Sequence, residues 1–365
     1  MTTQKRSATG TGLTIGFAAL GLAVVTAIPA AAQSTQSYEV SGQEVSIYNV
    51  AGEITVRAGG GSAVVVELTS GGADAGELSV ETGSIGGVET LRVIYPSDRI
   101  VYPGMNSGSR TETRIRDDGT FGDSHDGWGS RDRGDRIRIS GSGSGLEAYA
   151  DMVISVPRGQ RINVYLAVGT ASVTNVDGDI RMDTQSAPVI AREIRGSLVV
   201  DVGSGSVDVS DVDGDLNIDT GSGAVEVTGV SGSSTLIDTG SGSVTALGIT
   251  STELNIDTGS GRIRASEVAA GDIRLDTGSG SVDLEVLNDP DHIEIDTGSG
   301  SVTLTVPSSF GARVEIDTGS GGIEMEMPIT MRRWQRDHVN GTIGDGSGTL
   351  IIDTGSGSVR VLEGR

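Results

Sequence analysis

The sequence predicts an all-β protein that folds as a parallel β-solenoid, or β-helix, with coils of about 19 residues. Three observations support this prediction. The motif Asp-Thr-Gly-Ser-Gly recurs at nearly constant spacing, apolar and polar residues alternate on both sides of it, and 57 of the 365 residues are glycine whereas only 3% are aromatic. Such a composition suits many short strands joined by tight turns better than one thick core.

Residues 1–32 are expected to be a signal peptide. A basic start at Lys5 and Arg6 precedes an apolar segment over 13–28, and three alanines ending at Ala32 provide the small residues that a signal peptidase reads. An uncleaved anchor is the alternative, but the apolar segment is short for a membrane span of about 20 residues. We therefore expect export to the periplasm, cell surface or medium after cleavage near Ala32, with no membrane span afterwards.

The segment 40–96 is predicted to be a β-rich region that caps the repeats. Runs such as Val45 to Val50 and Ala63 to Leu68 are rich in apolar residues and are bounded by glycines, as strands are. The next segment, 97–146, is rich in Gly, Ser, Arg and Asp and poor in apolar residues. It is therefore predicted to be a flexible loop.

The solenoid itself is predicted for 147–365, with a degenerate first coil near 162–178. Successive motifs are 18 to 21 residues apart until the last step, which is 36 residues long and is interpreted as one coil plus an insertion at 328–349. A fixed period near 20 residues is typical of stacked units that bury one another's faces. The structural turn aspartates of the coils are Asp201, Asp219, Asp238, Asp257, Asp276, Asp296, Asp317 and Asp353.

Each coil is predicted to contain two strands. Apolar residues stand three and one positions before the aspartate, as in Leu254 and Ile256, and six and eight positions after it, as in Ile263 and Ala265. This period of two marks strands with one buried and one exposed face. Because two short strands are not stable alone, we expect each to pair in parallel with its counterpart in the next coil along the chain.

The residue types of the turn have expected roles. The aspartate is expected to accept N–H bonds from the turn, and the glycines are expected to adopt positive φ. The threonine and serine can bond their counterparts one coil away. A column of aspartates about 4.8 Å apart is tolerable only where the carboxylates are solvated or hydrogen-bonded, since like charges on adjacent strands repel.

Three parts of the chain resemble a known family. They are Asn49 to Val56 (Asn-Val-Ala-Gly-Glu-Ile-Thr-Val), the ladder of Thr-Gly-Ser-Gly turns, and Gly341 to Gly346 (Gly-Thr-Ile-Gly-Asp-Gly). Together these motifs resemble the bacterial "putative adhesin" domain family of unknown function. The likeness covers about 40–365 apart from the loop near 97–146. It implies a β-helical cell-envelope protein with no assigned chemistry.

Composition excludes several classes of function. The net charge of −23 and the few aromatic rings disfavour nucleic-acid binding, and the absence of cysteine rules out disulfides and thiolate metal sites. The Asp-Thr-Gly-Ser motif resembles the active-site loop of aspartic proteases, whose two carboxylates must face each other, whereas parallel copies stack. No catalytic residue, resident metal or cofactor is therefore predicted.

Two rival functions stay open. A carbohydrate-active β-helix enzyme, such as a polysaccharide lyase, would use carboxylates with a basic residue, and Arg262, Arg264 and Arg274 are available in the array. We expect instead that Arg264 pairs with Asp283, and Arg274 with Glu294, one coil further on. A calcium-dependent scaffold would use clustered carboxylates such as those of 211–215, but the distal Glu of an EF-hand loop is missing. Calcium binding is thus left open and not expected.

A candidate ligand patch lies in the insertion, where several cationic and aromatic residues gather: Arg332, Arg333, Trp334, Arg336 and His338. Capping of the last coil is the alternative role of this insertion. The sequence therefore predicts an exported, non-enzymatic, adhesin-like cell-envelope protein that presents flat repeat faces to an unknown surface, polymer or partner protein.

Overall fold

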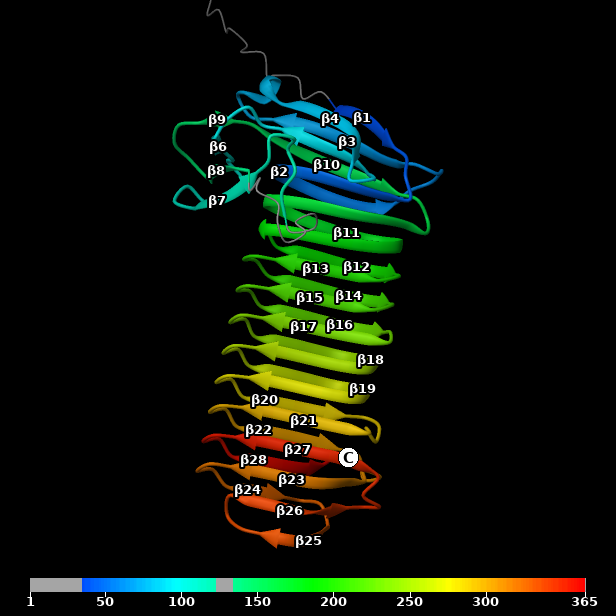
Figure 1. Cartoon of the computed structure of the whole chain (residues 1–365), viewed down its shortest axis with the longest axis vertical. Coiled ribbons are helices and arrows are strands. Elements are labelled where there is room, and N and C mark those ends of the chain that lie inside the picture. The colour runs from blue at the N-terminus through cyan, green and yellow to red at the C-terminus, as the bar shows by residue number, and fades with distance from the viewer. Residues whose placement is uncertain (1–34, 123–133, 365) are drawn as a thin grey trace, which may run out of the picture. The chain divides into compact units, whose positions relative to one another are not determined.

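The computed structural model describes residues 35–122 and 134–364, and the segment expected to be a signal peptide lies outside them. The described residues form strands, apart from one 3-10 turn at Ala75–Glu77 and the connecting turns. No helix among them is long and apolar enough to span a membrane. The strands belong to one 24-stranded sheet and one four-stranded sheet, and the predicted all-β solenoid is confirmed (Figure 1).

The first strands form a mixed cap on the stack. Their bounds are β1 Thr35–Val40, β2 Glu44–Ala58, β3 Val64–Gly71, β4 Ser79–Ile85, β5 Val88–Ile94 and β10 Tyr149–Val156. β3 pairs antiparallel with β1 and β10, and β4 pairs antiparallel with β5. β2 pairs in parallel with β5, β10 and β11 (Gln160–Ser186), so it joins the cap to the parallel coils.

The segment 97–146, predicted to be a flexible loop, contains a four-stranded sheet in its described part. Its strands are β6 Arg99–Val101, β7 Arg110–Ile115, β8 Asp135–Ser140 and β9 Leu146–Glu147. The prediction of a loop is wrong here because a few apolar residues that can be buried together are enough to hold a small sheet. Ile100 and Ile139 are buried in one cluster with Tyr48 and Tyr165, whose rings stack with centroids 4.3 Å apart. This small aromatic core holds the sheet against β2 and β11.

After β11 the chain forms coils of two strands each. The bounds are β12 Val189–Arg195, β13 Leu198–Val202, β14 Val207–Asp213, β15 Leu216–Thr220, β16 Val225–Ser231, β17 Ser234–Thr239, β18 Val244–Thr258, β19 Ile263–Thr277, β20 Val282–Val286, β21 His292–Thr297, β22 Val302–Val306, β23 Ala312–Thr318, β24 Ile323–Met325, β25 Ile329–Trp334, β26 His338–Ile343, β27 Gly348–Thr354 and β28 Val359–Glu363. Strands that precede the turn pair in parallel with one another, and so do strands that follow it.

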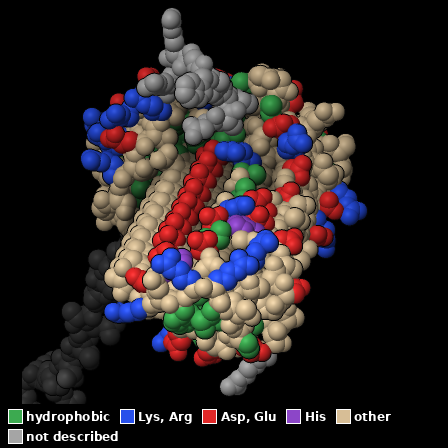
Figure 2. Space-filling model, turned by 60° about the horizontal axis from the view of Figure 1, so that its bottom comes forward, with side chains coloured by type: hydrophobic (Ala, Val, Ile, Leu, Met, Phe, Trp, Pro, Cys, Tyr) green, Lys and Arg blue, Asp and Glu red, His purple; other side chains and the backbone are tan. Residues whose placement is uncertain are grey.

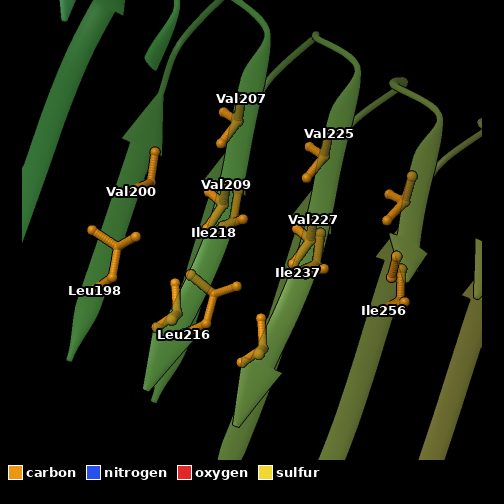
Figure 3. Close-up of a cluster of buried hydrophobic side chains, with 14 of the residues drawn as sticks. Leu198, Val200, Val207, Val209, Leu216, Ile218, Val225, Val227, Ile237 and Ile256 are labelled. Atoms are coloured by element: carbon orange, nitrogen blue, oxygen red, sulfur yellow. The ribbon is translucent and has the colours of Figure 1, made fainter. Parts of the chain in front are cut away.

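The main core lies between these two sets of strands. The residues three and one positions before the aspartate and six and eight positions after it are buried almost without exception. Figure 3 shows their aliphatic side chains in rows along successive strands. Glu226 and Glu294, which lie between such residues, are exposed, so the predicted alternation is confirmed. Ile323 and Met325 are partly exposed because, within the described chain, β24 pairs with β28 alone.

The turn glycines differ from the prediction. Gly259 and Gly261 do not have positive φ. A Cβ on either would lie 2.4 or 1.8 Å from the carbonyl oxygen of Gly240 or Gly242 in the preceding coil. Glycine is needed because the coils stack too closely for any side chain. Positive φ occurs instead at the second corner of the coil, at Asn175, Glu193, Asp211, Gly229, Gly248 and Glu267.

The last coil of the chain is not the last coil of the stack. β27 lies between β21 and β23, and β28 lies between β22 and β24, all in parallel (red strands in Figure 1). The expectation that coils stack in chain order is therefore wrong at this point. The insertion turns the chain back along the stack. Its strands β25 and β26 form a hairpin, and β26 pairs antiparallel with β23. This hairpin covers the edge of the terminal coil.

Candidate functional site

Buried threonines close four of the turns that follow the motif aspartates. At Thr277 the hydroxyl accepts the N–H of Gly280 at 3.0 Å and donates to the carbonyl of Gly261, in the preceding coil, at 2.9 Å. The same two bonds recur at Thr258, Thr297 and Thr354. The expected threonine partner one coil away is thus replaced by glycine backbone.

The aspartates of the motif do not bind the turn. Because successive side chains of a strand alternate, a buried threonine places the preceding aspartate on the outer face. Asp219, Asp257 and Asp276 are exposed, and their carboxylates form no hydrogen bond with any described residue. The threonine, and not the aspartate, accepts the N–H of the turn, because its side chain points inward to the place where that N–H is buried.

These outward aspartates form one straight column, which we name the acidic ladder. In stack order its members are Asp183, Asp201, Asp219, Asp238, Asp257, Asp276, Asp296, Asp353 and Asp317. Figure 2 shows the ladder as a continuous red stripe along the molecule. Neighbouring parallel strands lie about 4.8 Å apart, so the carboxylates repeat at that interval.

The electrostatics of the ladder follow from this spacing. Partial burial, and then the charge of the adjacent aspartates, raise the pKa of three members, Asp238, Asp276 and Asp353. Cationic or titratable side chains lie at both ends. Nη2 of Arg181 is 3.4 Å from Oδ2 of Asp201, and Nδ1 of His338 is 3.1 Å from Oδ2 of Asp317. The ladder is therefore an anionic strip bounded by an arginine and a histidine.

The structure divides the ligand patch predicted in the insertion. His338 begins β26 and contacts the acidic ladder through Asp317. The other members are exposed at the end of the stack, with Arg332, Arg333 and Trp334 on β25 and Arg336 in the hairpin turn. The sequence argument missed one neighbour, Met331, whose exposed fraction is 54%. In Figure 2 cationic and apolar side chains gather at this near end of the molecule.

Arg264 and Arg274, two of the three arginines considered for an enzyme, are engaged with carboxylates as predicted, whereas Arg262 forms no ion pair with any described residue. Arg264 lies 3.7 Å from Asp283, and Arg274 lies 3.8 Å from Glu294 and 3.0 Å from Asp272. The contacts with Asp283 and Glu294 join adjacent coils, whereas that with Asp272 lies within β19. Both arginines therefore have a structural role as partners of carboxylates in the stack.

Two carboxylates near the second corner, one of them in the 211–215 group considered for calcium, bind backbone N–H groups. Asp215 accepts the N–H groups of Ser233 and Ser234. Asp179 accepts the N–H and the hydroxyl of Ser197, and these bonds lower the pKa of Asp179. Among the residues that the structure describes, no group of three or more His, Asp or Glu side chains could hold a metal ion.

The fold and the ladder define an acidic, two-sided β-solenoid. The model of the Toastrack DUF4097 family matches residues 150–362, and the chain belongs to this family. The resemblance to an adhesin domain family of unknown function is thereby confirmed. None of the curated proteins matches the chain.

Two solved structures are similar to the chain. One is a "putative cell adhesion protein" from Clostridium sporogenes, with 9% identity and a TM-score of 0.22 over 91% of this chain and 100% of that one. The other is a "putative adhesin" from Bacteroides fragilis, with 11% identity and a TM-score of 0.40 over 92% of this chain and 99% of that one.

Proposed function

We propose that the protein is an exported, non-enzymatic, adhesin-like component of the cell envelope. Its flat repeat faces would contact a surface, a polymer or a partner protein. Membership of the Toastrack DUF4097 family supports the β-solenoid fold on which this role depends. The observation that carries the proposal is the regularity of the outward side chains.

Outward residues stand in register on both sets of strands. One set carries the acidic ladder, and the other carries a mixed column of Asp208, Glu226, Thr245, Arg264, Asp283 and Thr303. Each coil repeats the same backbone position about 4.8 Å further along. Stacked repeats of this kind create extended binding surfaces, and a regular face suits an extended or repetitive partner.

Rigidity supports the same role. The threonine bonds tie four of the turns to the preceding coil, so the face is preorganised. A preorganised surface loses less conformational entropy when it binds, which leaves more of the contact energy for affinity.

The absence of cysteine makes a direct test practical. Purified chain is first screened on arrays of glycans and envelope proteins. Single cysteines are then placed on the two faces, as Asn217→Cys on β15 and Glu226→Cys on β16, and are coupled to a bulky maleimide polymer. Ser260→Cys, on an exposed turn at the edge, is the matched control.

We expect one face label to abolish binding and the control label to preserve it. Binding that survives both face labels would contradict the proposal. Cleavage of an array polysaccharide by the purified chain would contradict its non-enzymatic part.

A further inference from the structure

We propose that β25 is a docking edge for an extended acidic segment of another protein, which adds to the sheet as a further strand. This inference goes beyond the proposed function, which concerns the repeat faces. It rests on an open strand edge, on unpaired arginines, and on exposed apolar side chains at one place in the fold.

The first observation is the open edge. Within the described chain β25 pairs with β26 alone, so the backbone N–H and C=O groups on its other edge have no strand partner. Five of its six residues are exposed, and Ile329 is half-buried. An exposed edge of this kind is a template for strand addition, a common mode of peptide recognition.

The second observation is charge. Arg332, Arg333 and Arg336 form no ion pair with any described residue, although the chain has 49 acidic and 26 basic residues. By contrast Arg360, on β28, lies 3.1 Å from Glu324. The planar guanidinium matches a carboxylate with two parallel hydrogen bonds. Three guanidiniums on one hairpin thus lack an anionic partner among the described residues, although that of Arg333 donates to the Gln335 side chain, and they favour the binding of an anionic segment.

The same charges select against a second copy of this chain. Two β25 strands in one sheet would place the arginines of one copy beside those of the other, and like charges on adjacent strands are destabilising. A bulge at Arg332 also interrupts the regular alternation of the strand. Met331 and Trp334, with exposed fractions of 54% and 45%, add apolar contact area for the partner's uncharged side chains. The occupant is thus acidic, extended and partly apolar.

The probe is a short synthetic peptide of alternating Val and Glu, and its binding to the purified chain is measured by fluorescence anisotropy. We expect Arg332→Gln/Arg333→Gln/Arg336→Gln to weaken binding at least about tenfold, since each charge-assisted bond is lost. The control Arg99→Gln/Arg195→Gln/Arg262→Gln changes the net charge equally at exposed arginines that lack ion pairs with any described residue and lie on other elements than the hairpin and its neighbour β23. It should bind as wild type does, and equal weakening by both triple variants overturns the proposal.

Backbone pairing is tested on the peptide, so that the fold of the protein is not at risk. Two further peptides are N-methylated, one at every Val and the other at every Glu. Successive N–H groups of a strand point to opposite edges, so a peptide that pairs by one edge tolerates one pattern and not the other. Equal affinities of the two methylated peptides overturn strand addition.

Alginate oligosaccharides and phosphatidylglycerol vesicles are measured in parallel. If either ligand binds more tightly than the peptide, and the triple variant of Arg332, Arg333 and Arg336 weakens that binding, the choice of an acidic peptide as partner is overturned. Polymer labels on Asn217→Cys and Glu226→Cys should leave peptide binding unchanged, which keeps this result separate from that for the repeat faces.

Discussion

The hydroxyls of four turn threonines join two coils, and Thr277 allows this contribution to be measured. Thr277→Val keeps the size of the side chain but leaves the N–H of Gly280 and the carbonyl of Gly261 without their partner. We expect the free energy of unfolding to fall by about 1–3 kcal/mol.

Thr220 provides the control at the same position of an earlier coil. Its hydroxyl is buried and has no hydrogen-bond partner among the described residues. Thr220→Val should therefore be neutral or stabilising in urea unfolding. Equal losses in Thr220→Val and Thr277→Val would show that the hydroxyl is not what joins the coils.

Gly261 tests the spacing of the coils. Since a Cβ there would lie 1.8 Å from the carbonyl oxygen of Gly242, the stack would have to open to admit it. We expect Gly261→Ala to lower the free energy of unfolding by at least about 1–3 kcal/mol. Ser260→Ala, at the exposed neighbour, should stay within about 0.5 kcal/mol of wild type. Matching melting temperatures for the two variants would contradict this stacking.

Two aspartates should respond to neutralisation in opposite directions. Partial burial and then Asp257 and Asp296 raise the pKa of Asp276, so its contribution to stability is complete below the unfolded pKa and is lost as pH rises through the higher folded pKa. The pKa of Asp179 is lowered by its bonds to Ser197, so its contribution is present above the unfolded pKa and is lost as pH falls through the lower folded pKa.

At neutral pH we therefore expect Asp276→Asn to raise the melting temperature and Asp179→Asn to lower it. Melting curves recorded from pH 7 down to about pH 4, near the ordinary aspartate pKa, should also show a smaller gain on acidification in Asp276→Asn than in wild type. A lower melting temperature for Asp276→Asn at neutral pH would contradict repulsion along the ladder.

At the scale of strands and coils, the alternation of apolar and polar residues predicts which face of each strand is buried. Alternation around Ile256 and Ile263 depends on neighbours in sequence, and it identifies the buried face correctly. The sheet within 97–146 depends on Ile100 reaching a core that includes Tyr165, a contact that no short sequence window contains.

The order of the coils could not be predicted from the sequence, for a different reason. The Asp-Thr-Gly-Ser-Gly of Asp353 is identical to those of Asp296 and Asp317, so any of these coils can pair with any other in the same register. The arrangement of the candidate site likewise could not be predicted from the sequence. The sequence identifies the cationic insertion, but the contact of His338 with the acidic ladder requires β26 to return along β23.

Disulfide trapping tests the order of the coils in this cysteine-free chain. Thr303 and Arg360 are direct neighbours on β22 and β28, and parallel neighbours about 4.8 Å apart suit a disulfide. We expect Thr303→Cys/Arg360→Cys to crosslink on oxidation. Thr303→Cys/Glu324→Cys should not, because β28 lies between its two strands. The reverse result would mean that the coils stack in chain order.

At the scale of the whole molecule, the stack is closed by strands of opposite direction. β3 and β10 pair antiparallel in the cap, and β26 pairs antiparallel with β23 beyond the last coil. Covered ends protect a repeat protein from end-to-end association, since an open parallel edge would template another copy. Among the described strands at this end, β24 and β25 each keep one open edge, and that of β25 carries the arginines on which the inferred docking depends.

The central claim is that the stack is a complete scaffold for contact, held by backbone and threonine hydrogen bonds rather than by a bound cation. Thermal unfolding of the purified chain in EDTA, followed by addition of calcium, tests it most directly. We predict melting temperatures equal within about 2 °C, because removing a ligand that contributes no binding energy cannot change stability. A fall of more than about 10 °C in EDTA that calcium reverses would contradict the claim and identify a calcium-dependent scaffold.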